Sequence, residues 1–331
     1  MSPLTIANVL IHPSQFPEAV RADLLQSLRT RKVNHKFHYD SVKQTQKWLA
    51  LHEACSPSRT DADCIAIYER SFEAAANFVK ASAVHVIGLG CGGGQKDARL
   101  LRLLRDRGKR LSYTPCDVSV AMVLVARAAA LSIVAVNDCY PLVCDLANAD
   151  DLAEVLPQSQ STEARLVTFF GMIPNFEPQI IVPRLARLIH PDDLLLFSAN
   201  LAPGADYADG VRQILPLYDN QLTRVWLMTF LLDSGVESSD GELRFGIEDD
   251  PAGSGLKRVV ANFSFSRPRR VKVEAEAFEF VAGDSVRLFF SYRHTPERIV
   301  SMLSQQGLSV LERWIAKSKE EGVFLCRAAQ R

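Results

Sequence analysis

Short apolar runs and helical patterns alternate along the middle of the chain. Residues 83–89 (AVHVIGL) form a nearly continuous apolar run, which is typical of a strand buried on both faces. Residues 95–107 instead place leucines at helical spacing. The same patterns predict strands over 83–89, 111–117, 132–136, 165–171 and 193–200, and helices over 61–81, 95–107, 118–131 and 177–189. This alternation predicts βαβ units and a parallel sheet with helices on both faces.

The pattern changes after Asn200, where alternating apolar and polar positions replace the continuous apolar runs. Such alternation predicts an antiparallel sheet with one face in solvent. The later segments are two predicted helices (207–218 and 220–232), two alternating strands (257–265 and 270–280), and a terminal helix from 295 with strands over 308–315 and 322–328. We expect the terminal hairpin to rejoin the parallel sheet as its antiparallel edge.

Together these elements predict an α/β fold, in which a Rossmann-like domain is interrupted by an inserted α+β domain. We expect residues 61–199 and 291–331 to form the Rossmann-like domain. Residues 1–60 and 200–290 are expected to form the second domain.

Composition narrows the class of protein. Lys and Arg together number 38, as do Asp and Glu, so no net charge favours binding to nucleic acid. The N-terminus lacks the pattern of a signal peptide, and the longest apolar stretch is interrupted by Arg127, so neither secretion nor a membrane span is predicted. The seven cysteines include no CxxC pair, and His35 and His38 have no companion ligands, so we expect reduced thiols, no metal and a cytoplasmic protein.

A glycine-rich segment follows the first central strand. In GLGCGGGQKD, residues 88–97, five glycines occur within seven positions, which allows a ligand to approach the backbone closely. Gly88, Gly90 and Gly93 match the G-x-G-x-x-G dinucleotide fingerprint, but the same position in methyltransferases holds S-adenosyl-L-methionine (SAM). Asp117, at the end of the next strand, suits the ribose of either ligand. The absence of further pyrophosphate donors and the terminal hairpin favour SAM, with an NAD(P)-binding oxidoreductase as an alternative.

Several motifs in order extend this argument: GLGCGGGQKDARLL, YTPCDVS, CDL, FFGMIPNFEP, YDN and FFSYRHTPE. From about Lys36 to the C-terminus, the chain resembles the SAM-dependent histidine N-α-methyltransferases of ergothioneine biosynthesis and their tryptophan-methylating fungal relatives. The resemblance implies a SAM-binding methyltransferase domain, an inserted substrate-binding domain, and S-adenosyl-L-homocysteine (SAH) as a product.

The resemblance also implies which residues bind the cofactor. They are Gly88, Gly90, Gly92 and Lys96 at the loop, Asp117 at the ribose, Cys144, Asp145 and Leu146 at the adenine, and Phe170 and Gly171 below the sulfonium. The family usually opens its loop with an acidic residue, and Gly88 stands at that position here.

On the substrate side, the resemblance implies that Asn175 and Tyr218 hold the amino and carboxylate groups of an amino acid and aim its amine, which makes them the catalytic pair. Tyr39 matches the N-terminal motif of the family, and Ser291 matches a residue of the side-chain pocket. Where the family has a second tyrosine, Cys55 or Ser56 occurs in this chain.

Two further differences lie in the expected side-chain pocket. Phe289 replaces the glutamate that binds imidazole, and Ala261 replaces a methionine. A phenyl ring cannot accept an imidazole N–H as a carboxylate does, so strict specificity for histidine is not expected. We therefore expect N-methylation of an amino acid or an amino-acid-derived amine. The alternatives are methylation of another small metabolite and SAM binding without turnover. A monomer is favoured, and the number of transferred methyl groups stays open.

Overall fold

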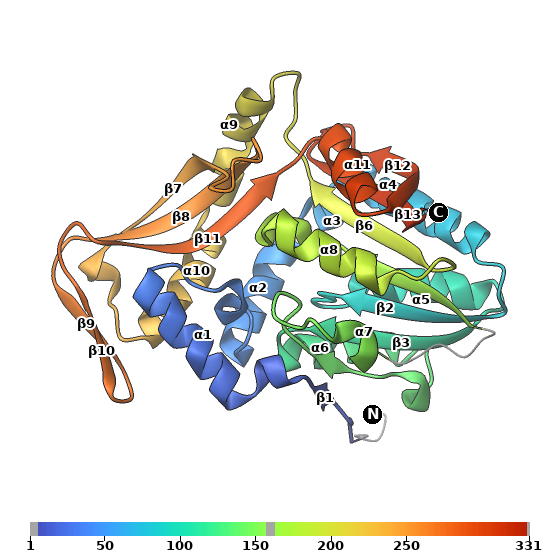
Figure 1. The fold of residues 1–331 in the computed structure, drawn as a ribbon, viewed down its shortest axis with the longest axis horizontal. Helices are drawn as coiled ribbons and strands as arrows, with labels where there is room; N and C mark the ends of the chain where they lie inside the picture. The colour runs from blue at the N-terminus through green and yellow to red at the C-terminus, as the bar shows by residue number, and fades with distance from the viewer. Residues whose placement is uncertain (1–5, 157–162, 330–331) are drawn as a thin grey trace.

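A large mixed sheet organises the right half of the molecule in Figure 1. The computed structural model describes residues 6–156 and 163–329, so residues 1–5, 157–162, 330 and 331 of the expected domains lie outside the described part. The sheet has the order β1-β4-β3-β2-β5-β6-β13-β12. Its strands are β1 (Leu10–Ile11), β2 (Ala83–Leu89), β3 (Arg110–Asp117), β4 (Leu142–Val143), β5 (Glu163–Phe169), β6 (Leu194–Asn200), β12 (Leu308–Ile315) and β13 (Glu321–Ala328).

The terminal hairpin forms the antiparallel edge of this sheet, as predicted. Strands β1 to β6 pair in parallel, whereas β13 pairs antiparallel with β6, and β12 pairs antiparallel with β13. The α/β fold predicted from the sequence is therefore confirmed.

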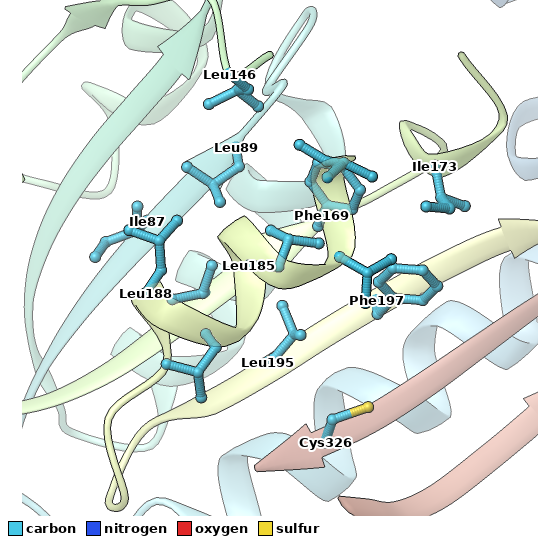
Figure 2. Close-up of a cluster of buried hydrophobic side chains, with 14 of the residues drawn as sticks. Ile87, Leu89, Leu146, Phe169, Ile173, Leu185, Leu188, Leu195, Phe197 and Cys326 are labelled. Carbon is cyan, nitrogen blue, oxygen red and sulfur yellow. The ribbon is translucent and has the colours of Figure 1, made fainter. Parts of the chain in front are cut away.

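Helices cover both faces of the large sheet, which explains why its central strands are apolar throughout. Along β2, Ile87 and Leu89 point into one buried cluster, whereas Val84 and Val86 point into the other. In Figure 2, Leu185 and Leu188 of one covering helix lie against the first cluster. The helices are α4 (Ala62–Phe78), α5 (Gln95–Asp106), α6 (Val120–Ala130), α7 (Leu152–Val155), α8 (Pro178–Leu188) and α11 (Pro296–Gln305).

A smaller antiparallel sheet, β11-β8-β7, lies on the left of Figure 1, with a projecting two-stranded hairpin, β9-β10. These strands are β7 (Gly241–Asp249), β8 (Lys257–Phe265), β9 (Arg269–Val273), β10 (Glu276–Phe280) and β11 (Ser285–Arg293). The helices in this half are α1 (Pro17–Thr30), α2 (Val42–Cys55), α9 (Tyr207–Tyr218) and α10 (Gln221–Asp233), while the short α3 (Pro57–Thr60) leads to α4. One buried cluster joins Leu28 and Phe37 of the N-terminal segment to Leu227 of α10 and Phe263 of the sheet.

We keep the division into two domains as a proposal. The N-terminal segment contributes to both sheets, because β1 pairs with β4 while Leu28 packs against the smaller sheet. None of the helices in the described part is both long and apolar enough to cross a membrane.

Two predicted strands differ from the structure. Residues 132–134 form a turn, in which the N–H groups of Ile133 and Val134 donate to the carbonyl of Ala130 and so end helix α6 instead of joining a sheet, and Val136 begins a short 3-10 helix (Val136–Asp138). Residues 270–280 form the two strands of a hairpin, which turns where Glu274 adopts a left-handed conformation with φ +52°.

Candidate active site

One cavity of about 1080 Å³ lies between the carboxyl ends of the parallel strands and the smaller sheet. Ligands of open α/β sheets bind at this edge, where loops from successive strands meet. Every residue expected to contact cofactor or substrate lines the cavity except Gly88: Tyr39, Gly90, Gly92, Lys96, Asp117, Cys144, Asp145, Leu146, Phe170, Gly171, Asn175, Tyr218, Phe289 and Ser291. The fold thus gathers residues from both halves of the chain around one space.

The glycine loop connects β2 to α5 and lies against the end of β3. The N–H of Cys91 donates to the carbonyl of Cys116 at 3.0 Å, and the N–H of Gly92 donates to Oδ2 of Asp117 at 3.0 Å. Gly90 has φ +64°, and a β-carbon there would lie 2.4 Å from the sulfur of Met172. A side chain at position 90 would be strained by the left-handed backbone conformation and would require Met172 to move.

Asp117 ends strand β3 with a buried carboxylate facing the cavity. Burial raises its pKa to about 6, although the N–H groups of Gly92 and Ser119 donate to it and act in the opposite direction. Its remaining lone pairs can accept hydrogen bonds from hydroxyl groups, as the ribose of SAM requires.

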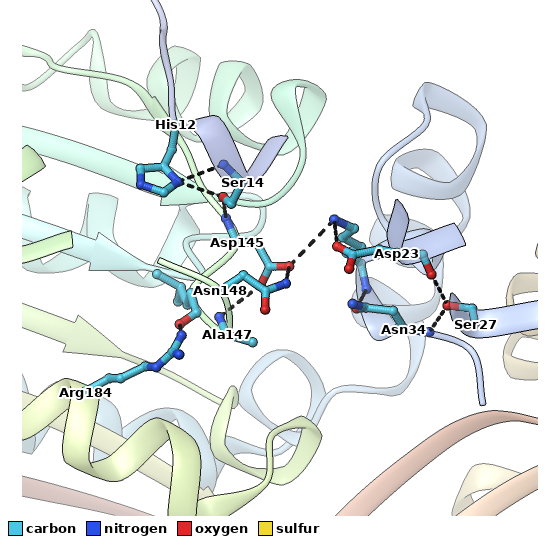
Figure 3. A network of polar contacts seen from close by, with 11 residues as sticks. His12, Ser14, Asp23, Ser27, Asn34, Asp145, Ala147, Asn148 and Arg184 are labelled. Carbon is cyan, nitrogen blue, oxygen red and sulfur yellow. Dashed lines mark hydrogen bonds and ion pairs between the residues drawn. The ribbon is translucent and has the colours of Figure 1, made fainter. Parts of the chain in front are cut away.

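Asp145 follows β4 at the far side of the same cavity. Its carboxylate accepts hydrogen bonds from the N–H of Ala147 and from Nδ2 of Asn148, both at 2.9 Å, and Nζ of Lys36 lies 3.8 Å away. Figure 3 shows Asp145 between Ser14 and Asp23, two residues of the N-terminal segment. Burial raises the pKa of Asp145, and the charge of Lys36 partly offsets that rise. This polar rim, with Cys144 and Leu146 beside it, suits an adenine that needs both acceptors and apolar contacts.

Lys96 lies in the first turn of α5, and its side chain lines the cavity. Its Nζ donates to the hydroxyl of Tyr68 at 2.9 Å and lies 3.9 Å from Oε1 of Glu321. Burial lowers the pKa of Lys96, and the charge of Glu321 opposes that change. Phe170 packs edge-on against Tyr68, and the N–H of Gly171 donates to Oγ of Ser198 at 2.8 Å.

Gly88 plays a different part from the one expected, because it does not line the cavity. A β-carbon at Gly88 would lie 2.1 Å from Oδ2 of Asp97. Asp97, which our sequence reasoning missed, lines the cavity directly. The available signal was an acidic residue in the first turn of the helix that follows the glycine loop.

Asn175 presents a defined end of its amide to the cavity. Its Nδ2 donates to the carbonyl of Phe290 at 2.9 Å, so Oδ1 is the end left without a protein partner among the described residues. Asn175 does not cap α8, because that helix is preceded by Glu177. Asn175 therefore offers a hydrogen-bond acceptor to a ligand.

Tyr218, Ser291 and Arg293 form a second polar group on the cavity wall. The hydroxyl of Tyr218 lies 2.8 Å from Oγ of Ser291 and accepts a hydrogen bond from Nη2 of Arg293 at 2.8 Å. Arg293 was missed from the sequence, although it lies within the SYRHTPE motif. Its other contacts are main-chain carbonyls, of Leu201 at 3.2 Å and Glu320 at 3.5 Å.

Aromatic rings enclose the space beside this polar group. Phe289, which is 6% exposed, packs against Trp226, Tyr218 and His35 with ring centroids 5.3 to 6.0 Å apart. Tyr39 packs against Trp226 at 5.5 Å, and its pKa is raised by burial and by the charge of Asp117.

Two other differences from the family involve Ala261 and either Cys55 or Ser56. Ala261 pairs with Phe289 across the two strands, is fully buried and does not itself line the cavity. Cys55 and Ser56 both line the cavity, and Oγ of Ser56 lies 2.9 Å from Oγ of Ser58.

Comparisons with known proteins identify the family of the chain. Residues 20–221 and 254–328 match the model of the histidine-specific, SAM-dependent methyltransferase family. The chain is 25% identical to the histidine N-alpha-methyltransferase of Mycolicibacterium smegmatis, over 97% of this chain and 98% of that protein.

Solved methyltransferase structures are more distant. The CcbJ methyltransferase of Streptomyces caelestis is 16% identical with a TM-score of 0.40, and 79% of this chain and 94% of that chain are covered. The magnesium protoporphyrin IX methyltransferase of Synechocystis PCC 6803 with bound SAH is 12% identical with a TM-score of 0.43. This match covers 88% of this chain and 97% of that chain.

The family match decides between the two cofactors considered for the glycine loop. The NAD(P)-dependent alternative is wrong, because the matched family is SAM-dependent. Which residues contact SAM stays a prediction. The chain belongs to the histidine-specific, SAM-dependent methyltransferase family and is a SAM-dependent methyltransferase.

Proposed function

We propose that this enzyme methylates the α-amino group of an amino acid or of an amino-acid-derived small molecule, and that histidine is not its preferred acceptor. The acceptor is a small molecule, and we propose that the enzyme acts as a cytoplasmic monomer.

The observation that carries the proposal is the state of Arg293. Its side chain is 6% exposed and lines the cavity, yet among residues 6–156 and 163–329 it forms no ion pair. Its Nε has no hydrogen-bond partner in that part of the chain. A buried guanidinium normally has an anionic partner, because an isolated buried charge is unfavourable. The carboxylate of an amino acid would supply that partner, and Tyr218 and Ser291 would bind it as well.

Asn175 suits the other end of the same substrate. Methyl transfer requires a neutral amine whose lone pair points at the methyl group. The Oδ1 of Asn175 can accept one amine hydrogen, while its Nδ2 is already held by Phe290, so the direction of the acceptor is set before the substrate binds. A fixed acceptor of this kind favours the reactive orientation, which is a large part of what catalysis needs here. SAM supplies the electrophilic methyl group when it is bound.

The proposed preference rests on the apolar surroundings of Phe289. Its ring occupies the pocket wall between Trp226 and His35, where the family resemblance leads us to expect a carboxylate. Two apolar rings favour an aromatic or aliphatic side chain, since burying apolar area stabilises the complex by about 25 cal/mol per Å². The ring of Phe289 itself offers no acceptor for an imidazole N–H in place of water.

The test is a mass-spectrometric methylation assay with SAM and a panel of free amino acids that includes histidine, tryptophan, phenylalanine and leucine. We expect an acceptor other than histidine to have the highest kcat/KM, and its methyl ester to be a much poorer substrate. Preference for histidine would overturn the proposed specificity. If no amino acid is methylated by an enzyme that binds added SAH in a separate measurement, the proposed acceptor class is wrong. Another small metabolite would then be favoured as the acceptor.

A further inference from the structure

Asp97 places a buried carboxylate in the cofactor half of the cavity. It is 3% exposed and accepts hydrogen bonds from the hydroxyl of Tyr113 at 2.7 Å and from Oγ1 of Thr168 at 2.8 Å. Both donors are neutral. Within the described part of the chain Asp97 forms no ion pair, although Lys96 is its neighbour in sequence.

Buried carboxylates are normally paired with a cation, because removal from water is unfavourable for an isolated charge. Each oxygen of Asp97 uses one lone pair for its neutral donor and keeps further accepting capacity. Because Asp97 also lines the cavity, a cationic group of a ligand can reach it.

Gly88 creates the space for this carboxylate. A β-carbon at position 88 would lie 2.1 Å from Oδ2 and 3.1 Å from Cγ of Asp97, and 3.2 Å from the hydroxyl of Tyr113. Any other residue at position 88 would displace the acid. The end of β2 and the first turn of α5 are therefore matched: one supplies the space and the other supplies the charge.

Lys96 adds a charge of the opposite sign next to Asp97. Its ammonium lies over the ring of Tyr68, 4.3 Å from the centroid, and faces the same cavity. Consecutive residues thus offer a cation and an anion to the ligand. The amino-acid part of SAM is a zwitterion with an α-ammonium and an α-carboxylate, so the two charges are complementary to it.

We propose that Asp97 binds the α-ammonium of the amino-acid part of SAM, and that it does so only because position 88 is glycine. The inference concerns the cofactor half of the cavity and does not depend on which acceptor the enzyme methylates. Its experiment measures binding alone, so its failure is distinguishable from a failure of the proposed function.

The experiment compares three ligands by isothermal titration calorimetry with the full-length enzyme. They are SAH, the SAH analogue in which hydrogen replaces the α-amino group, and 5′-methylthioadenosine, which has no amino-acid part. The proteins are the unmodified enzyme and Asp97→Asn, which keeps the shape of the side chain and removes its charge.

We expect Asp97→Asn to weaken SAH binding by about 10- to 100-fold, the range for losing a charge-assisted hydrogen bond. Binding of the deaminated analogue and of 5′-methylthioadenosine should change by less than about twofold, because neither carries the ammonium. Equal weakening of all three ligands would show that Asp97 only shapes the loop and would overturn the proposal. Unchanged SAH binding would overturn it as well.

The unmodified enzyme supplies a test that needs no variant to fold. If it binds the deaminated analogue as tightly as SAH, no residue binds the ammonium, and the proposal is wrong. The paired substitution Gly88→Glu with Asp97→Thr returns an acid to position 88 while removing Asp97. We expect this variant to bind SAH more tightly than Asp97→Asn does. Equal or weaker binding would contradict the proposal that an acid at position 88 and an acid at position 97 can replace one another.

Discussion

The guanidinium of Arg293, at the end of β11, donates a hydrogen bond to the hydroxyl of Tyr218, the last residue of α9, over 2.8 Å. The two residues belong to a strand and a helix and lie 75 positions apart in the sequence. The contact holds the tyrosine hydroxyl in the cavity and presents a buried cation beside it. Arg293 is the cation that we propose to bind the carboxylate of the acceptor.

Replacing Arg293 tests the proposed carboxylate contact. We expect Arg293→Met to raise KM for the amino-acid acceptor by about 10- to 100-fold, because a charge-assisted contact is lost. Steady-state kinetics should show that the methyl ester of the same amino acid is affected far less, since it offers no carboxylate. Arg293→Lys, which keeps the charge, is the matched control. Its KM for the amino acid should lie between those of the unmodified enzyme and Arg293→Met. Equal losses with acid and ester would contradict the assignment.

Phe289→Glu tests specificity. The substitution gives the pocket an acceptor for an imidazole N–H, so we expect kcat/KM for histidine to rise by about tenfold or more relative to the unmodified enzyme. Activity on apolar amino acids should fall in the same assay. Phe289→Leu, which stays apolar, should leave histidine a poor substrate. A histidine kcat/KM that does not rise in a folded Phe289→Glu variant would show that this residue does not contact the side chain of the acceptor.

Asn175→Ala removes the proposed acceptor for the amine. We expect kcat/KM to fall by about 100-fold, the effect of losing the orientation of a reacting group. SAH affinity, measured by calorimetry, should stay within about twofold because Asn175 lies on the acceptor side of the cavity. Asn175→Asp keeps an oxygen but loses the bond that Nδ2 donates to Phe290. It should therefore lose activity as well, and an active Asn175→Ala enzyme would contradict the proposed role.

Asp117 predicts a pH dependence of cofactor binding. Burial raises its pKa to about 6, so the carboxylate is ionised above that pH and protonated below it. The ionised form accepts hydrogen bonds from ribose hydroxyls more strongly. Affinity for SAH should therefore be constant from pH 7 to 8 and weaken as the pH falls through about 6. Asp117→Asn should bind SAH more weakly at pH 7.5 and lose this step, whereas a step that persists in the variant would belong to another group.

The large sheet predicts where stability is most sensitive. Phe197 of β6 is fully buried and stacks on Phe169 with ring centroids 5.8 Å apart. Both side chains belong to the buried cluster drawn in Figure 2. We expect Phe197→Ala to lower the free energy of unfolding by about 3–5 kcal/mol, measured by urea denaturation. Leu217, which is 57% exposed, provides the control. Leu217→Ala should change the free energy of unfolding by less than about 0.5 kcal/mol. Similar effects of the two substitutions would contradict the packing described here.

Local patterns were sufficient for most of the secondary structure. The strand predicted over 83–89 has the same bounds as β2, and the helix predicted over 207–218 has the same bounds as α9. These elements pack with the periodicity that their own residues carry. The apolar run at 132–136 was misread because periodicity alone does not distinguish a short strand from a turn that packs on the core, as Ile133 does.

The candidate site was predictable where a motif carries its own geometry. The glycine loop, Asp117 and the residues after β4 line the cavity as the resemblance implied. Asp97 and Arg293 were missed although both lie inside quoted motifs, because an acid in a helix and an arginine in a strand are common on protein surfaces. They are distinguished by being buried while forming no ion pair with any residue that the structure describes, and burial depends on segments that are remote in sequence.

The sequence by itself predicted most of the strands and helices, because these rest on spacing between neighbouring residues, and it indicated the family through motifs that follow in order along the chain. The tertiary structure decided which charges face the cavity without an ion pair to another described residue, and which end of the Asn175 amide has no hydrogen bond from that part of the chain. Those properties arise from contacts such as Gly88 with Asp97, Asn175 with Phe290 and Tyr218 with Arg293. No local pattern encodes them, because each is set by how separate elements pack against one another.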